Sequence, residues 1–313
     1  MSIKNVALVG ANGSLGSVLL SSLVNSGAFT ITAIIRPSSS FTSPYPASQV
    51  RVAHTDDALS SASLQEVLAG QDAVIAAFRY HDPDAHIRLV EAAALAGARV
   101  FIPADFGSID ADHPRARQLV PLYNHKLAVR RRAQELAEEF APRFTWTGIV
   151  CGHFFEWGVR EGHFRADLAR RVADVLDGGE HRASTTTLAR LGEAVVRILE
   201  LSQGEGGGPS SEAIRNKTLF LQSFCISQNE LVRALERATG STWDVNPLDS
   251  EEFIRESKRR VDEGGKEAVE DVVFALGALY SDWTRREDFR ITMETLGFED
   301  EDLDEALAAA LRG

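Results

Sequence analysis

The chain has 313 residues, of which 44% are hydrophobic and 25% charged, an ordinary composition for a globular protein. It carries 33 lysines and arginines against 45 aspartates and glutamates, which gives a net charge of −12. This balance argues against a nucleic-acid-binding surface, because binding phosphates over a broad face needs clustered positive charge, but a local pocket for an anionic cofactor remains open.

The first half of the chain alternates strand-like and helix-like segments. Apolar runs predict strands at 5–10, 29–37, 72–78, 99–107 and 144–150. Helical patterns lie between them at 14–27, 63–71, 83–97 and 119–139, and Asp82 and Pro83 are typical of an N-cap and a first helical position. Repeated strand–helix–strand units predict right-handed crossovers, and apolar strands fit a sheet covered on both faces. The expected fold is α/β, a Rossmann-type doubly wound parallel sheet.

The pattern changes after residue 154. The stretch "GEGGGPSS" at 204–211 predicts a flexible connection, and 216–222 predicts one more strand. Ser227 and Glu230 have capping-box spacing at the start of a helix that ends on Gly240. The remainder reads as helical.

These patterns predict two domains. Residues 1–154 form a dinucleotide-binding domain, to which 183–222 returns, and 155–313 make up most of a smaller, helix-rich substrate lobe that closes over the binding edge of the sheet.

The segment "GANGSLG" between the first strand and the first helix contains Gly10, Gly13 and Gly16. Glycines allow a tight turn and let a pyrophosphate approach the backbone at a helix N-terminus, although a glycine turn can also serve packing alone. Its position after the first strand favours dinucleotide binding. The loop residues expected to bind the cofactor are Gly10, Asn12, Gly13, Ser14, Leu15 and Gly16.

The end of the second strand indicates which nucleotide binds. An NAD-binding chain usually has an acidic residue about 20 positions after the glycine loop, and here Arg36 stands there with Ser38 beside it. An arginine pairs with a ribose 2′-phosphate, so NADP(H) is the expected cofactor; the alternative is a surface arginine. Ala77 and Phe78 end another strand at this edge and are expected to line the cofactor crevice.

Several segments resemble the NmrA-like, isoflavone-reductase-like family of atypical short-chain dehydrogenases/reductases. They are "VALVGANGSLG" (6–16), "LVEAAALAGARVFIPADFG" (89–107), "HKLAVRRRAQELAE" (125–138) and "GHFFEWG" (152–158). The resemblance implies an NADP-binding Rossmann domain with a smaller substrate lobe, and enzymes that reduce small aromatic or apolar secondary metabolites.

The family's catalytic lysine corresponds to Lys126. A partly buried ammonium beside an oxidised nicotinamide loses proton affinity, so it could manage the proton that accompanies hydride transfer and bind the cofactor ribose. The alternative is a surface lysine next to Arg130–Arg132, three arginines expected to be solvated or paired with acids of the lobe. Tyr123 lies three residues before Lys126 rather than four, and is expected to line the pocket rather than to donate the proton.

The family's matching phenylalanine is Phe154, which is expected to pack on the nicotinamide; a plain core role is the alternative. Weaker candidates for the substrate pocket are Asp105, Phe106, Tyr123, His153 and Trp157. The bulky segment 78–80 departs from the small residues that the family has there.

The sequence therefore predicts a cytoplasmic NADPH-dependent oxidoreductase acting on a small molecule, with Lys126 handling the proton. Two alternatives stay open: a non-catalytic NmrA-like dinucleotide sensor that binds a protein partner, and an isomerase or cyclase that retains the cofactor. We expect no metal site, because the two cysteines and eight histidines lack ligand spacing, and neither a targeting segment nor a membrane span. The substrate and the oligomeric state, including a homodimer, are left open.

Overall fold

The computed structural model describes residues 2–79, 82–203, 209–265 and 267–312. The chain divides into two compact units, each assembled from three segments. Unit 1 comprises Met1–Asp105, His125–Ile149 and Leu191–Leu219, and unit 2 comprises Phe106–Asn124, Val150–Arg190 and Phe220–Gly313.

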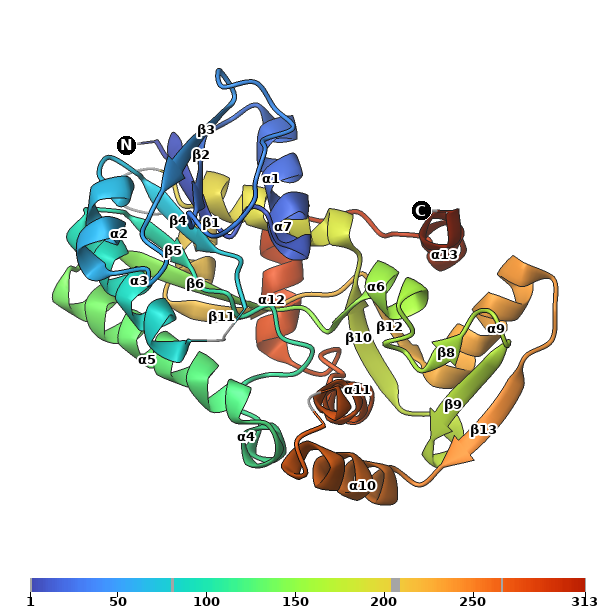
Figure 1. Cartoon of the computed structure of the whole chain (residues 1–313). Helices are drawn as coiled ribbons and strands as arrows, with labels where there is room; N and C mark the ends of the chain where they lie inside the picture. Colours follow the sequence, from blue (N-terminus) through green and yellow to red (C-terminus); the bar gives the residue numbers. More distant parts are fainter. Residues whose placement is uncertain (1, 80–81, 204–208, 266, 313) are drawn as a thin grey trace. The chain divides into compact units, whose positions relative to one another are not determined.

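A seven-stranded sheet forms the centre of unit 1, in the order β11-β6-β5-β4-β1-β2-β3 (Figure 1). Its strands are β1 (Asn5–Val9), β2 (Thr30–Ile35), β3 (Val50–His54), β4 (Ala73–Ala76), β5 (Val100–Ile102), β6 (Thr145–Val150) and β11 (Lys217–Phe220). The accompanying helices are α1 (Ser14–Ser26), α2 (Ser61–Leu68), α3 (Pro83–Leu95), α5 (Pro121–Glu139), α7 (Leu188–Leu201) and α8 (Pro209–Ile214). Strands β1 to β6 pair with their neighbours in parallel, so the predicted α/β, doubly wound fold is confirmed.

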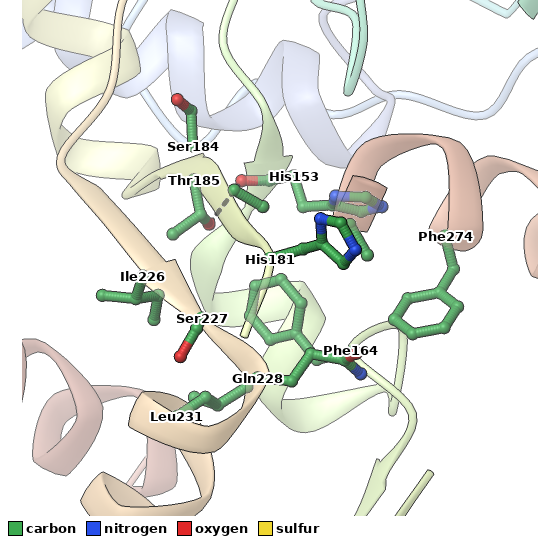
Figure 2. A pocket seen from close by; sticks show the side chains of 12 residues that line it. His153, Phe164, His181, Ser184, Thr185, Ile226, Ser227, Gln228, Leu231 and Phe274 are labelled. Carbon is green, nitrogen blue, oxygen red and sulfur yellow. Dashed lines mark hydrogen bonds between the residues drawn. The ribbon is translucent and has the colours of Figure 1, made fainter. Parts of the chain in front are cut away.

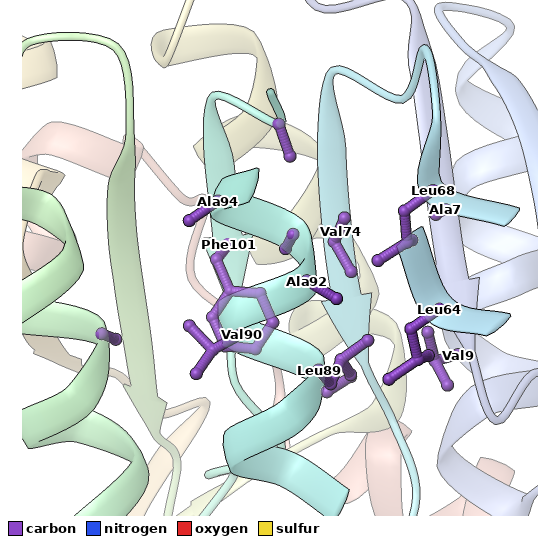
Figure 3. Packing of buried hydrophobic residues seen from close by; sticks show 14 of the residues in the cluster. Ala7, Val9, Leu64, Leu68, Val74, Leu89, Val90, Ala92, Ala94 and Phe101 are labelled. Atoms are coloured by element: carbon purple, nitrogen blue, oxygen red, sulfur yellow. The ribbon is translucent and has the colours of Figure 1, made fainter. Parts of the chain in front are cut away.

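The core of unit 1 explains why the central strands are continuous apolar runs. Leu64 of α2, Leu89 of α3 and Phe101 of β5 belong to one fully buried cluster with β1 and β4 (Figure 3). Burying each such side chain contributes roughly 1.5–3 kcal/mol. On the helices α1 and α7, Gly192 lies directly against Ser22, so this pair packs closely as well.

Two features of unit 1 differ from the sequence prediction. The strand β3 was missed, because its central residues are exposed at the edge of the sheet and form no apolar run. The helix expected at 119–139 is present as α5, but it begins at Pro121; a short helix that was not predicted, α4 (Pro114–Leu119, in unit 2), precedes it and ends at Val120, which is extended. A residue that precedes a proline avoids the helical region, and Pro121 follows Val120.

Unit 2 contains two three-stranded sheets, in the orders β12-β10-β7 and β13-β9-β8. Its strands are β7 (His153–Phe154), β8 (Ala166–Asp167), β9 (Val172–Leu176), β10 (Arg182–Thr186), β12 (Phe224–Ser227) and β13 (Asp244–Leu248). Its helices are α4, α6 (Phe155–Arg160), α9 (Gln228–Thr239), α10 (Ser250–Asp262), α11 (Ala268–Tyr280), α12 (Glu287–Leu296) and α13 (Leu303–Arg312), with a 3-10 turn η1 (Asp177–Gly179). The capping box of α9 and its end on Gly240, in the left-handed region, are confirmed.

The helix-rich lobe is confirmed, but the prediction overlooked these two sheets. Their strands have only two to five residues, and β13 is exposed along most of its length, so the sequence signal for them is weak. Residues 106–124, expected in the dinucleotide-binding domain, belong to unit 2. Arg115 ties them there, since it donates to Glu251 Oε1 at 2.6 Å and to the Tyr280 hydroxyl at 2.9 Å. Of the flexible connection expected at 204–211, residues 204–208 lie outside the described residues and the rest begins α8.

Candidate functional site

The glycine loop joins β1 to α1 at the point where the strand order reverses, with β2 on one side of β1 and β4 on the other. Gly10 has φ +91°, and a Cβ there would lie 2.7 Å from the carbonyl oxygen of Ala77. A Cβ on Gly16 would lie 2.0 Å from the carbonyl oxygen of Gly10. Only glycine fits at either position, and the crevice at such a reversal is where parallel sheets bind dinucleotides.

The first turn of α1 offers its backbone N–H groups to an anion. Gly13 is the N-cap, and among the described residues no side-chain oxygen caps this helix and no acidic residue lies in its first turn. Asn12 and Ser14 are exposed, whereas Leu15 is half-buried. Uncapped N–H groups and the helix dipole fit a pyrophosphate, so the residues present suit a dinucleotide.

Arg36 follows β2 and is exposed, as a reader of a 2′-phosphate must be. The loop also contains a residue that the sequence analysis missed. Asp57 accepts a hydrogen bond from the Ser38 backbone N–H at 2.9 Å. Hydrogen bonds from Ser38 hold the pKa of the Asp57 carboxyl below its ordinary value, and Arg36 adds to this effect. A carboxylate therefore occupies the Ser38 N–H in the neighbourhood of Arg36. The sequence analysis missed Asp57 because it did not recognise strand β3, which ends three residues earlier at His54.

Phe78 follows β4 beside the glycine loop, and a Cβ on Gly10 would lie 3.0 Å from its Cβ. Its ring stacks on that of His86 from α3, with centroids 3.9 Å apart and planes 15° apart. His86 is fully buried, and burial lowers its pKa to about 4, so the imidazole is neutral near pH 7. Ala77 is buried and Arg79 exposed, whereas Tyr80 lies outside the described residues. The departure from small residues at this position is thus accommodated by a stacked pair.

Lys126 is buried on α5, with 8% of its surface exposed. Its Nζ donates a hydrogen bond to the backbone carbonyl of Asp105, which follows β5, and lies 3.8 Å from that residue's Oδ1. Arg130, one turn further along α5, donates to Oδ2 of the same carboxylate. The lysine is therefore held at the carboxyl edge of the sheet and is no surface lysine.

The structure gives new information on Asp105 and corrects the expectation for Arg130. Asp105 is only 2% exposed and faces two cations of α5, and its place in a substrate pocket stays a prediction. Arg130 is buried and its acid belongs to unit 1, not to the lobe. Arg132 does reach solvent and pairs with Glu91 at 2.8 Å. Three adjacent arginines of one helix point to different faces, and the four-residue spacing from Lys126 to Arg130 is the signal that could have identified the inward one.

In unit 2, Phe154 lies on β7 and is half-buried. Its ring meets that of Trp157 from α6 edge to face, with centroids 4.7 Å apart. Tyr123 is buried, its hydroxyl 3.4 Å from that of Ser108, and Phe106 is buried with φ +30°. The structure thus brings Phe154 and Trp157 together, whereas Tyr123 is packed inside unit 2.

His153 precedes Phe154 on β7, and neighbouring strand residues point to opposite faces. It lines a cavity of about 40 Å³ with Phe164, His181 and Phe274 (Figure 2). A space of that size holds a few water molecules, whereas ligand pockets measure roughly 300–1,000 Å³. Burial lowers the pKa of His153 to about 4. A Cβ on Gly277 of α11 would lie 2.0 Å from its Cε1, so His153 belongs to the packing of unit 2 rather than to a substrate pocket.

Among the described residues, no group of three or more histidines, cysteines, aspartates and glutamates could hold a metal ion. In the same part of the chain, no helix combines the length and apolar character needed to cross a bilayer.

The model of the NAD(P)H-binding family matches residues 10–200 of this chain. A protein of Aspergillus flavus named oxidoreductase aprR is 31% identical over 264 residues, which cover 84% of this chain and 83% of that protein. Oxidoreductase poxI of Penicillium oxalicum is 31% identical over 311 residues, which cover 96% of this chain and 92% of that protein. A solved structure of isoflavone reductase superimposes with a TM-score of 0.67 at 18% identity, covering 96% of this chain and 91% of that one, a likeness that shows the fold.

These matches bear on three expectations. The assignment as an oxidoreductase and the choice of a nicotinamide dinucleotide as cofactor are confirmed at the level of the family. The resemblance to isoflavone-reductase-like proteins is confirmed for the fold.

Proposed function

This chain belongs to the NAD(P)H-binding family, and from that premise we propose that it is an NADPH-dependent reductase of a small aromatic or apolar metabolite. Unit 1 binds the cofactor and unit 2 supplies the substrate lobe. When bound, the reduced nicotinamide supplies the hydride that an electrophilic carbon of the substrate accepts. Lys126 donates the proton that completes the two-electron reduction, directly or through water.

The observation that carries the proposal is the burial of Lys126 Nζ on the carbonyl of Asp105, at the same sheet edge as the glycine loop. Anchoring by a backbone oxygen uses one of the three N–H donors of an ammonium group. In the proposed reaction the same ammonium also contacts the cofactor ribose and the substrate. A lysine that served stability alone would be expected at the surface, because burying an ammonium is costly.

The preference for NADPH rests on Arg36, because a guanidinium is a strong donor to a phosphate. The Ser38 N–H can serve the phosphate only by releasing the Asp57 carboxylate. No acidic residue replaces Arg36 at the end of β2 to bind a free ribose hydroxyl.

The proposal is tested by calorimetric titration of the protein with NADPH, NADP+, NADH and NAD+. We expect NADPH to bind at least about tenfold more tightly than NADH, and Arg36→Ala to abolish that preference. Arg255→Ala is the matched control, because Arg255 is an exposed arginine of unit 2. Equal affinities for NADPH and NADH would contradict the role of Arg36.

A substrate panel then tests the chemistry, with NADPH consumption as the signal. Turnover that disappears in Lys126→Ala, while that variant still binds NADPH, supports a reductase. Tight binding of the oxidised nucleotides with poor binding of NADPH, and no turnover of any compound, would instead favour a dinucleotide sensor.

A further inference from the structure

Lys126 shares one carboxylate with a second cation. Lys126 and Arg130 stand four residues apart on α5, so both side chains project from the same face of the helix. Arg130 Nε donates to Asp105 Oδ2, whereas Lys126 Nζ lies 3.8 Å from Oδ1 and bonds the carbonyl of Asp105 instead. All three residues are at least nine-tenths buried.

Comparing the Lys126–Asp105 and Arg130–Asp105 pairs by charge alone would not predict that one contact is much shorter than the other. A carboxylate attracts an ammonium as strongly as a guanidinium, and in a buried site the attraction is much larger than in water. Arg130 nevertheless holds the shorter contact to the carboxylate, through Nε on Oδ2. The Lys126 ammonium bonds the neutral carbonyl oxygen and keeps a longer ion pair, 3.8 Å, with Oδ1.

Resting on the proposed function, we propose that Asp105 and Arg130 are positioning residues for Lys126. Arg130 holds the Asp105 carboxylate and prevents it from capturing the ammonium, while the Asp105 carbonyl fixes Nζ in place. The lysine therefore stays able to release its proton to a substrate and regain it. Without Arg130, the carboxylate would bind Nζ directly and retain the proton.

Titratable groups face Lys126 from three elements. Asp105 follows β5, Arg130 lies on α5, and His86 approaches from α3. The imidazole of His86 is neutral above about pH 5, because burial depresses its pKa to about 4. Of these three groups, Asp105 and Arg130 are the ones that carry a charge in the working range of pH.

The proposal is tested by titrating Lys126 itself, without substrate or cofactor. Reductive methylation with 13C-formaldehyde gives each lysine a resonance whose shift follows its protonation, and the resonance missing from Lys126→Arg assigns the site. We expect Arg130→Gln to raise the apparent pKa of Lys126 by about one unit or more, and Asp105→Asn to lower it by a similar amount. Arg130→Lys, which restores a cation, should return it toward the wild-type value.

Arg131→Gln is the matched control, because the neighbouring Arg131 is exposed, and it should leave the titration unchanged. If Asp105→Asn fails to fold, the double variant Asp105→Asn/Arg130→Gln is used in its place. Because the double variant removes both charges, its Lys126 should titrate close to the wild-type pKa. Shifts of the same sign in the two single variants, or no shift in Arg130→Gln, would overturn the proposal. These readings need no turnover, so failure here is distinct from failure to bind NADPH or to reduce a substrate.

Discussion

The two units differ in the charged side chains that they bury. Unit 1 gathers Asp105, Lys126 and Arg130 in one place, each less than a tenth exposed. Unit 2 buries hydroxyls along β10, where Thr185 donates to the carbonyl of His153 at 2.7 Å and Thr186 to that of Cys151.

This difference indicates which buried polar groups serve function and which serve stability. Removing charges from water costs several kcal/mol per ion even when they are paired, so a buried charge cluster points to function rather than stability. A buried hydroxyl that bonds a backbone carbonyl contributes about 1 kcal/mol and ties neighbouring segments together. Where unit 2 does bury a charge, in Arg190, the partner Glu301 at 2.9 Å is partly exposed.

The largest expected effect is on turnover. Lys126→Met should lower the rate of NADPH consumption by about 10²-fold or more, with little loss of stability, because Arg130 still pairs with Asp105. Thr186→Val should do the reverse, lowering the free energy of unfolding by about 1–2 kcal/mol without slowing turnover. Both variants are checked by the rate of NADPH consumption with any substrate found in the panel and by thermal unfolding. A wild-type rate in Lys126→Met would contradict a functional role for the buried charge cluster.

Gly16 in unit 1 and Gly277 in unit 2 allow the two units to be compared by substitution at a closely packed glycine. Gly16→Ala and Gly277→Ala each place a Cβ 2.0 Å from another atom, a backbone oxygen in the first case and the His153 ring in the second. The ring can turn toward its cavity and the backbone cannot, so Gly16→Ala should cost about 3 kcal/mol or more and Gly277→Ala about 1–2 kcal/mol. Unfolding measured with and without NADPH should show stabilisation by the cofactor in Gly277→Ala only.

Acid should destabilise each unit through one histidine. The pKa values of His86 and His153 are lowered from 6.5 to about 4 by burial, so the unfolded chain binds more protons than the folded one between these values. Stability is complete above pH 6.5 and falls as the pH drops toward 4, by roughly 3 kcal/mol at most for His86.

Replacing one histidine at a time should show how much of the acid-induced loss of stability each one causes. His86→Phe keeps the stack on Phe78 and should flatten the pH dependence in that range, as should His153→Phe in unit 2. His54→Gln is the control, since His54 is exposed. The free energy of unfolding is measured at several pH values. If it depends on pH as steeply in His86→Phe as in the wild type, the assignment to His86 is contradicted.

The smallest effect concerns Asp57. Asp57→Asn removes a carboxylate from the Ser38 N–H and from the neighbourhood of Arg36, so NADPH should bind a few-fold more tightly while NADH binding stays unchanged. Calorimetry at low and high salt checks this, and tighter binding of both nucleotides would rule out competition for the phosphate site.

Local signals carried much of the fold. Asp82 and Pro83 begin α3 and Ser227 and Glu230 cap α9, because a helix end is satisfied by residues within one turn. The order of apolar runs was enough for the parallel sheet and the glycine loop. Arg36 could be singled out because its distance from that loop along the chain is set by one strand and one helix.

Contacts between distant segments decided the rest. The carbonyl of Asp105 and Lys126 meet across 21 positions, Asp105 and Arg130 across 25, and Ser38 and Asp57 across 19. The helical period places Arg130 on the face of Lys126, but no periodicity in a sequence reports which carboxylate that face meets. Those choices follow from how α5 packs on the sheet, since burial and electrostatic partners depend on tertiary neighbours, whereas capping and hydrophobic period depend on the chain alone.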